Sequence, residues 1–475
     1  MNKLVLNLIH NKSTIRKLHI LERLSTEEGL ITSKELAKQL NCSNRTIVNE
    51  ISELKNNLPE NWDIIAMKAK GYMLQKPPTE SLSRIIMSHL QESTIYRILI
   101  ETFNNNYYTL EKWSQISYTN KLTLKSNLKQ FKAVLKENNL KFKFEPVELE
   151  GEEINIRYFY KALFFNIEQC VPMISLPDDL MRKIKDILNY YNVEIDNILL
   201  KVMIYVSIQR IISKNFMDKK IKLNIIFNPD QLTCFNRIIS GIEDYSMVKL
   251  SKNEKDALNL FFFYITAGNT QQKIDILKYH EYENGEHYQK FLELVDMIIS
   301  TNEGYPIEYD YLKLELYFYF YKLYSSKYYN FPLEYFFTRP NYLSHRLQGL
   351  YDTNCRIISK WNEAVNRSNF NEYEISQLAQ HLTYIMCSVY PKKNVLFSFF
   401  GDNIHERMAY TTLKDNFGDS VDIHRKPEDK TKYDLIITNY KDSYPTKTPV
   451  LFIYQKFDQR DIESINHVLF NYNSC

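Results

Sequence analysis

Apolar positions recur every three or four residues through the first part of the chain, and short polar turns separate the runs. The run over 15–27 has one apolar face, which predicts an amphipathic helix. Two further runs, over 34–40 and 45–55, are separated by little more than Asn41 and Cys42. Two helices joined by so short a turn form a helix-turn-helix, whose second helix enters the major groove of DNA. The pattern therefore predicts a three-helix domain with a DNA-binding motif.

A β-hairpin is predicted directly after these helices. Residues 63–67 form an extended run, Lys68, Ala69, Lys70 and Gly71 form a basic turn, and residues 72–75 return as a second strand. Such a hairpin after a helix-turn-helix is interpreted as a wing. The two prolines that follow end this first domain.

The start of the second helix carries side chains that can contact DNA. Ser43 or Asn44 can cap this helix, and Glu50 is expected on the same exposed face. The hydroxyl, amide and guanidinium groups of the exposed residues on this helix can bond to base edges and phosphates. The lysines at the wing tip can neutralise a phosphate. An ordinary helical hairpin with a polar outer face is the alternative. The predicted DNA contacts of this domain are Ser43, Asn44, Arg45, Thr46, Asn49, Lys68 and Lys70.

A second helix-turn-helix is predicted further along. Residues 80–103 are helical in spacing, and Thr109 can cap a helix over 110–116. A turn at 118–120 then leads into one long helix over 121–136. A wing-like hairpin is expected after it, with one strand at 141–144 and the other at 147–149.

Lysines form a stripe along the predicted long helix. From Lys112 to Lys143 the chain has eight lysines and one acidic residue, Glu137. This local excess of positive charge indicates a surface that faces phosphates. A solvated helix face whose lysines only maintain solubility is the alternative. The stripe consists of Lys136 and four predicted DNA contacts, Lys121, Lys125, Lys129 and Lys132.

Helical spacing continues through the middle of the chain. The pattern Glu-x3-Leu-x5-Tyr-Ile starts at Glu254 and again at Glu374, which indicates a diverged internal repeat. Two copies of a helical bundle are therefore expected. The predicted helices cover 152–170, 180–191, 196–213, 231–245, 252–267, 285–300, 308–325, 340–366 and 373–388.

Short apolar strands alternate with helices after Pro391. This alternation is typical of a small α/β domain with a mostly parallel sheet. Residues 401–403 are expected to form a loop after the first strand. The strands are predicted at 394–400, 421–424, 434–438 and 450–454, and the helices at 404–416 and 458–470.

Composition narrows the possible function classes. The net charge is only +3, so a nucleic-acid surface has to be local. The six cysteines have no metal or disulfide spacing, which suits a reducing cytosol. The longest apolar run, 258–267, is too short to cross a membrane, and the N-terminal apolar run is too short for a signal peptide. A soluble cytoplasmic protein with no membrane segment and no cofactor is expected.

An enzyme is the main alternative class. The chain has no GxxxxGK[ST] or GxSxG motif. The stretch from His280 to His287 is similar to a zinc-binding helix. Its two histidines are seven residues apart, whereas two ligands on one helical turn need a spacing of four. No enzyme and no metal site is therefore predicted.

The order of these segments resembles the Mga/AtxA family of virulence regulators of Gram-positive bacteria. The best local matches are KELAKQL, KGYMLQKP, LEGEEINIRYF and YEISQLAQHL. The resemblance implies a mainly α, multidomain chain, with two winged helix-turn-helix domains, two phosphotransferase-system regulation domains (PRDs) built as helical bundles, and a C-terminal α/β domain that resembles transporter IIB subunits. On this basis the domains are expected at 1–78, 79–160, 161–278, 279–391 and 392–475.

The resemblance also implies how such a chain is regulated. In this family, PRD histidines can accept phosphate from phosphotransferase-system phosphocarrier proteins, and the IIB-like domain supports a homodimer. The second PRD has His381 at an acceptor position, so His381 is the predicted phosphorylation site. The first PRD has Ile198 and Phe261 at the matching positions, and the C-terminal loop has Asn403 where a transporter subunit has its phosphorylated cysteine.

These features together predict a promoter-binding transcription regulator, and more specifically an activator of virulence genes. Histidine phosphorylation and homodimerisation through the IIB-like domain are expected to tune its activity. Two alternatives remain. One is a regulator whose degenerate PRDs respond to a signal outside the phosphotransferase system, and the other is a phosphocarrier, against which Asn403 argues. A lone histidine on a partly apolar helix is also often a core residue, so His381 has that second interpretation.

Overall fold

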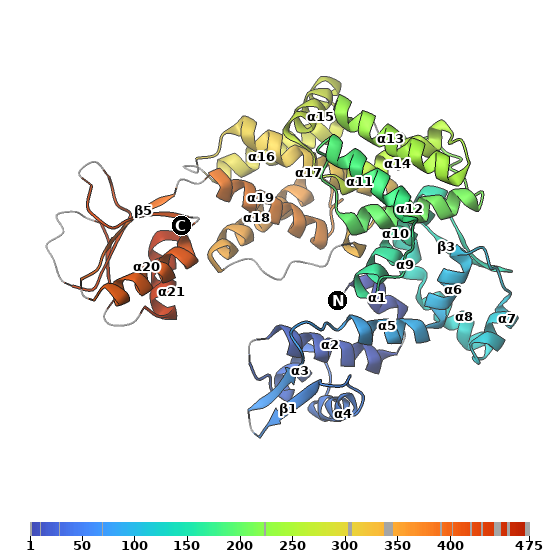
Figure 1. Ribbon diagram of the computed structural model, residues 1–475, viewed down its shortest axis with the longest axis horizontal. Coiled ribbons are helices and arrows are strands. Elements are labelled where there is room, and N and C mark those ends of the chain that lie inside the picture. The colour runs from blue at the N-terminus through green and yellow to red at the C-terminus, as the bar shows by residue number, and fades with distance from the viewer. Residues whose placement is uncertain are drawn as a thin grey trace. The chain divides into compact units, whose positions relative to one another are not determined.

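The computed structural model describes the whole chain except residues 1, 10, 28, 69, 223–224, 303–305, 337–344, 390–391, 401, 419, 429–430, 441–447, 454–456 and 471–475. The structure is mainly helical and divides into two compact units (Figure 1). The first unit comprises Met1–Ile276 and Tyr321–Thr338, and the second comprises Leu277–Phe320 and Arg339–Cys475. No helix within the described ranges is long and apolar enough to span a membrane.

The first unit begins with the predicted winged helix-turn-helix. An apolar core of its own, which includes Leu21, Leu36 and Ile51, lies beneath the helices. The hairpin strands pair in antiparallel register, with Asp63 opposite Gln75 and Met67 opposite Gly71. The elements are α2 (Lys12–Thr26), α3 (Ser33–Gln39), α4 (Asn44–Lys55), β1 (Asp63–Met67) and β2 (Gly71–Gln75), which confirms the predicted order.

The second helix-turn-helix follows two helices that were predicted as one. Ser93 ends the first of these helices and caps the second, where its Oγ accepts a hydrogen bond from the amide of Tyr96 at 3.3 Å. The same hydroxyl donates to the carbonyl of Leu8 at 2.6 Å. The elements are α5 (Ser83–Glu92), α6 (Thr94–Phe103), α7 (Leu110–Ile116), α8 (Lys121–Gln130), α9 (Lys132–Glu137), β3 (Lys141–Phe144) and β4 (Val147–Glu150).

The predicted long helix over 121–136 is wrong in one respect, because it breaks at Phe131. The backbone there is turn-like, with φ −73° and ψ −6°, and its amide lies 3.4 Å from the carbonyl of Asn127. The Phe131 ring is buried and packs against Phe142 and Phe159, with ring centroids 6.4 and 6.3 Å apart. Burial of this ring therefore fixes a bend that helical spacing alone does not reveal.

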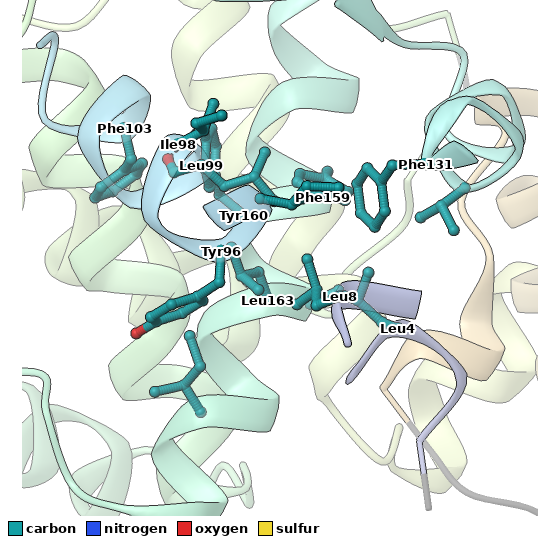
Figure 2. Packing of buried hydrophobic residues seen from close by; sticks show 14 of the residues in the cluster. Leu4, Leu8, Tyr96, Ile98, Leu99, Phe103, Phe131, Phe159, Tyr160 and Leu163 are labelled. Carbon is teal, nitrogen blue, oxygen red and sulfur yellow. Dashed lines mark hydrogen bonds between the residues drawn. The ribbon is translucent and has the colours of Figure 1, made fainter. Parts of the chain in front are cut away.

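Helix α10 (Glu153–Cys170) is the central element of the first unit, because residues from every face of it are buried. The N-terminal helix α1 (Lys3–Leu8), which the sequence did not reveal, packs on it. Figure 2 shows Leu8 beside Leu163 of α10, and Phe131 facing Phe159. One core thus joins the N-terminus, the second helix-turn-helix and the first helix of the bundle region.

The bundle region agrees with the predicted helices, apart from one that was missed. Helix α15 follows α14 after only four residues, and its apolar spacing did not separate it from its neighbours. Residues 340–344 of the predicted helix over 340–366 lie outside the described residues. The helices are α11 (Asp178–Tyr190), α12 (Asn197–Ile212), α13 (Pro229–Ser246), α14 (Lys252–Ile265), α15 (Thr270–Glu283), α16 (Glu286–Thr301), α17 (Tyr309–Tyr329), α18 (His345–Ala364) and α19 (Glu372–Val389).

The C-terminal part of the second unit has the predicted α/β pattern. Its four strands pair in parallel in the order β6-β5-β7-β8. The predicted loop residue Gly401 and strand residue Tyr454 lie outside the described residues, and the loop ends at Asp402. The elements are β5 (Lys393–Ser398), α20 (Asn403–Phe417), β6 (Val421–His424), β7 (Leu435–Thr438), β8 (Val450–Phe452) and α21 (Gln459–Phe470).

Candidate DNA interface

The first helix-turn-helix is fixed by local hydrogen bonds. Thr32 caps α3 in a reciprocal capping box with Glu35. Ser43 is the residue that caps α4, where its Oγ accepts from the amide of Thr46 at 3.1 Å. The Thr46 hydroxyl lies 2.8 Å from the same oxygen, so both hydroxyls belong to the cap. These bonds fix the angle at which α4 leaves the turn.

Three predicted contact residues on α4 are exposed. Asn44, Arg45 and Asn49 project from its first two turns, whereas Ile47 and Ile51 on the opposite face are buried. Thr46 is half-buried. The outer face of α4 therefore offers amide and guanidinium groups, and these side chains can form paired hydrogen bonds with purine edges.

Glu50 corrects the sequence interpretation. It was expected on the exposed face of α4, but it is only 4% exposed and points into the domain. Its carboxylate accepts hydrogen bonds from the Ser13 hydroxyl at 2.6 Å, from Arg16 Nε at 2.8 Å and from Arg16 Nη2. Burial alone would raise the pKa of Glu50, but the bonds from Arg16 and Ser13 outweigh it and hold the pKa below its usual value. Glu50 thus fastens α4 to α2.

An isolated β-bridge joins the wing to Ile31, in the segment that precedes α3. The amide of Ile31 donates to the carbonyl of Tyr72 at 3.0 Å, and the amide of Tyr72 donates to the carbonyl of Ile31 at 2.8 Å. Gly71 permits this approach, because its φ is +127° and a Cβ atom would lie 2.4 Å from the Ile31 oxygen. Lys68 and Lys70 are exposed at the tip, while Ala69 lies outside the described residues.

The second helix-turn-helix has a turn similar to that of the first and also begins its second helix with a side-chain cap. Asn120 caps α8 as Ser43 caps α4, with its side chain accepting from the amide of Leu122 at 2.8 Å. Tyr118, two residues before its cap, has φ +48°, and Asn41 in the first motif has φ +49°. Counting from the two caps places Leu122 where the first motif has Arg45.

The lysine stripe is only partly available for phosphates. Lys121 pairs with Glu111, and the lysines of the hairpin pair with Glu148 and Glu150. These acids lie just outside the window in which the lysine excess was counted. Lys125 is exposed with its Nζ 5.6 Å from the centre of the Phe144 ring. Lys129, Lys132 and Lys136 are exposed, and among the described residues no acid pairs with them.

Two apolar residues beside this stripe have no predicted role. Tyr118 lies in the predicted turn, and Leu122 is part of no predicted apolar face. Tyr118 is 98% exposed and Leu122 77% exposed. Aligning the two motifs on their caps places Leu122 at the position of Arg45, a predicted DNA contact.

The predicted phosphorylation site lies in the second unit. His381 is half-buried on α19, and its ring stacks on Tyr319 of α17 with centroids 4.6 Å apart and planes 25° apart. Burial, followed by the charge of Glu374, raises the pKa of Tyr319 to about 12. His381 therefore belongs to an aromatic contact between two helices, with a carboxylate near the partner ring.

The matching position in the first bundle has different chemistry. The Nζ atom of Lys161 lies 3.0 Å from the centre of the Phe261 ring, and burial followed by Arg157 lowers the pKa of this lysine well below its usual value. Glu254, the counterpart of Glu374 in the repeat, accepts from Arg157 Nη1 at 2.7 Å and from Nη2 at 2.9 Å. Ile198, the other matching position, is exposed near the start of α12. Asn403 is the first residue of α20.

The rings of His280 and His287 lie close together, although their spacing of seven residues rules out a pair on one helical turn. They lie on α15 and α16, not on one helix, and Nδ1 of His280 is 3.1 Å from Nε2 of His287. Burial, and then the charge of His287, lowers the pKa of His280 to about 4. No cluster of three potential metal-ligating side chains exists in the part of the chain that the structure describes.

Comparisons with known proteins match the two helix-turn-helix regions separately. Residues 16–73 match a helix-turn-helix domain model, and residues 78–164 match the Mga helix-turn-helix domain. The anthrax toxin expression trans-acting positive regulator of Bacillus anthracis is 24% identical over 96% of this chain and 98% of its own length. The capsule synthesis positive regulator AcpB of the same organism is 33% identical over 153 residues, which are 32% of each protein.

A third relative, the capsule synthesis positive regulator AcpA of Bacillus anthracis, is 28% identical over 30% of each protein. The chain thus spans about a third of the two capsule regulators that it matches, and nearly all of the toxin regulator. Two side-chain-capped helix-turn-helix motifs, the second of them within the region that matches the Mga domain, accompany this nearly full-length similarity. The chain therefore carries a match to the Mga helix-turn-helix domain and is similar along nearly its whole length to a positive transcription regulator of the Mga/AtxA family.

Proposed function

We propose that this protein binds promoter DNA through both helix-turn-helix motifs and activates transcription. The relatives named above are described as positive regulators, which supports activation. The observation that carries the proposal is the outer face of α4. There Arg45, Asn44 and Asn49 are exposed beside a wing with two unobstructed lysines at its tip.

The proposed division of labour within the first motif follows from side-chain chemistry. Arg45 and Asn49 form hydrogen bonds to base edges, whereas Lys68 and Lys70 neutralise phosphates flanking the groove. Ser43 and Thr46, whose hydroxyls are committed to the cap, hold the helix end in place. Loss of a base contact should relax sequence preference, and loss of a wing lysine should weaken binding to all sequences alike.

A direct binding measurement tests this proposal. Duplexes are first selected by the full-length chain from a random-sequence library and then titrated with variants. Arg45→Ala should cost about 1–3 kcal/mol in binding at physiological salt. Arg23→Ala, which removes an exposed arginine from α2 outside the recognition helix and wing, is the matched control and should bind as the native chain does. If Arg45→Ala and Lys68→Ala each bind the selected duplexes as tightly as the native chain does, the proposal is contradicted.

We further propose that two copies of the chain associate through the C-terminal α/β domain. Ile404 and Met408 are four residues apart on α20, so they share one face, and both are about two-thirds exposed, at 65% and 64%. Phe400, just before this helix, is exposed as well. Exposed apolar side chains that share one helix face are typical of a protein contact, and a homodimer would place two sets of DNA-binding motifs on one site.

We also propose that phosphorylation of His381 lowers activity, with phosphotransferase-system phosphocarriers as the donors. A phosphoryl group would add nearly two negative charges beside a stacked tyrosine and near Glu374. The stack would then separate, because desolvation and repulsion both oppose a dianion there. Separation of α17 and α19 would shift the population of active dimer. A signal outside the phosphotransferase system that loosens the same contact is the second candidate.

A further inference from the structure

The exposed apolar pair at the start of α8, formed by Tyr118 and Leu122, has no role in the folded core. The inward face of this helix is provided by Leu124 and Leu128, which are fully buried. Leu122 sits in the first turn of the helix, where residues of a recognition helix meet base edges. An exposed leucine at that point therefore needs an explanation outside the folding of the domain.

Tyr118 is also unusual for its backbone conformation. Its φ of +48° is in the left-handed region, where asparagine and glycine are favoured and bulky side chains are not. The first motif has Asn41 at the equivalent place. Hydrogen bonds hold the turn, with the amide of Thr119 donating to the carbonyl of Ser114 at 3.0 Å. A tyrosine that is 98% exposed gives this turn no packing in return.

We propose that Leu122 recognises thymine methyl groups in the major groove, and that Tyr118 packs its ring on the adjoining sugar and donates its hydroxyl to a phosphate. The C5-methyl of thymine is the apolar group that bases present in this groove, and leucine has no atom that could bond to a polar base edge. This inference rests on the proposed function, because it requires α8 to enter a groove.

The surrounding charges fit such a placement. Lys125 and Lys129 on the following turns of α8, and Lys132 at the start of α9, are exposed and can hold the phosphates on either side of the groove. Arg45, in contrast, occupies the place of Leu122 in the first motif. The two motifs would therefore read different chemistry, polar base edges through α4 and methyl groups through α8, so that one binding site combines both kinds of information.

Replacing thymine by uracil in the DNA tests the idea, since the two bases differ only by the methyl group. Duplexes that the full-length chain selects from a random-sequence library are remade with deoxyuridine at single thymine positions. The native chain should bind about fourfold more weakly for each contacted methyl group that is removed. Leu122→Ala should bind the thymine and uracil duplexes equally well, with an affinity close to that of the native chain on uracil.

Two further variants separate this contact from general effects. Lys129→Gln should weaken binding to both duplexes by the same factor and keep the fourfold ratio, because a phosphate contact does not sense the base. Tyr118→Asn, which installs the residue of the first motif, should lower affinity for both duplexes without speeding the hydrogen exchange of the α8 amides. The Tyr118 part of the proposal is wrong if this variant binds as the native chain does.

Other outcomes overturn the inference in distinguishable ways. Equal binding of thymine and uracil duplexes by the native chain, with affinity otherwise intact, removes methyl recognition and leaves the proposed function standing. If Leu122→Ala keeps the fourfold ratio but loses promoter activation, the leucine contacts another protein and the inference fails. If the native chain selects no duplex at all, the proposed function fails and this inference fails with it.

Discussion

Replacing Glu50 distinguishes a structural role for this residue from a DNA-contacting one. A carboxylate exposed beside DNA repels phosphates, so its removal by Glu50→Gln would tighten binding and leave the domain stable. The structure instead has Glu50 buried against Ser13 and Arg16 of α2. We expect Glu50→Gln to destabilise the first helix-turn-helix and to weaken DNA binding only through that loss.

The expected magnitude follows from the contacts. The carboxylate accepts three hydrogen bonds, two of them from a guanidinium group, and bonds to charged groups contribute about 1.5–3 kcal/mol each without being additive. Breaking a fully buried ion pair costs about 3–5 kcal/mol. Because Arg16 keeps 25% of its side chain exposed and can turn to water, we expect a smaller loss of about 2–3 kcal/mol.

The assay has to report local stability, because a chain with two compact units is not expected to unfold in a single transition. Hydrogen exchange of α4 amides in the full-length chain meets this need. A loss of 2–3 kcal/mol should speed their exchange roughly 30- to 150-fold. Glu53→Gln is the matched control, since Glu53 lies one turn further along α4 and pairs with Lys17 but is 58% exposed. It should cost less than about 1 kcal/mol.

The same contact predicts a pH dependence. The pKa of Glu50 is lower in the folded domain than in the unfolded chain, so its stabilising contribution is complete above the unfolded pKa of about 4.3 and declines as pH falls through the folded pKa. Glu50→Gln should remove this acid-dependent part of the exchange profile. If Glu50→Gln exchanges as slowly as the native chain and binds DNA more tightly, Glu50 faces the DNA and the interpretation is refuted.

Three further results are expected. The double variant Lys129→Gln, Lys132→Gln should reduce the slope of log affinity against log salt by roughly 0.9 per lost phosphate contact. Lys121→Gln should leave this slope nearly unchanged, because Lys121 pairs with Glu111. Equal slopes for all variants would contradict a phosphate role. Ile404→Glu should raise the dimer dissociation constant measured by sedimentation, and a variant that remains as dimeric as the native chain would exclude this face as the interface. His381→Asp should lower promoter activity by a factor within the 5- to 150-fold range typical of allosteric coupling, whereas His381→Ala should not lower it. If both variants keep native activity under sugars that change phosphotransferase flux, His381 is a core residue.

Local signals in the sequence were sufficient wherever neighbouring residues alone set the structure. Thr109 caps the helix that it was predicted to cap, because a cap bonds to an amide only three residues away. The first hairpin follows from two extended runs joined by a short turn, and the parallel C-terminal sheet from short apolar strands that alternate with helices. The domain boundaries and the equivalence of the two helical bundles remain predictions.

Contacts between distant residues decided what the sequence left open. Glu50 has the polar character of a surface residue, yet it is buried because Arg16, 34 residues earlier, offers it a partner. The same holds for the bend at Phe131, which depends on the burial of its ring against Phe159. Periodicity records which face of a helix is apolar, but it does not record which polar side chain finds a partner across the fold. Only the tertiary structure separates a buried carboxylate from an exposed one on the same helix.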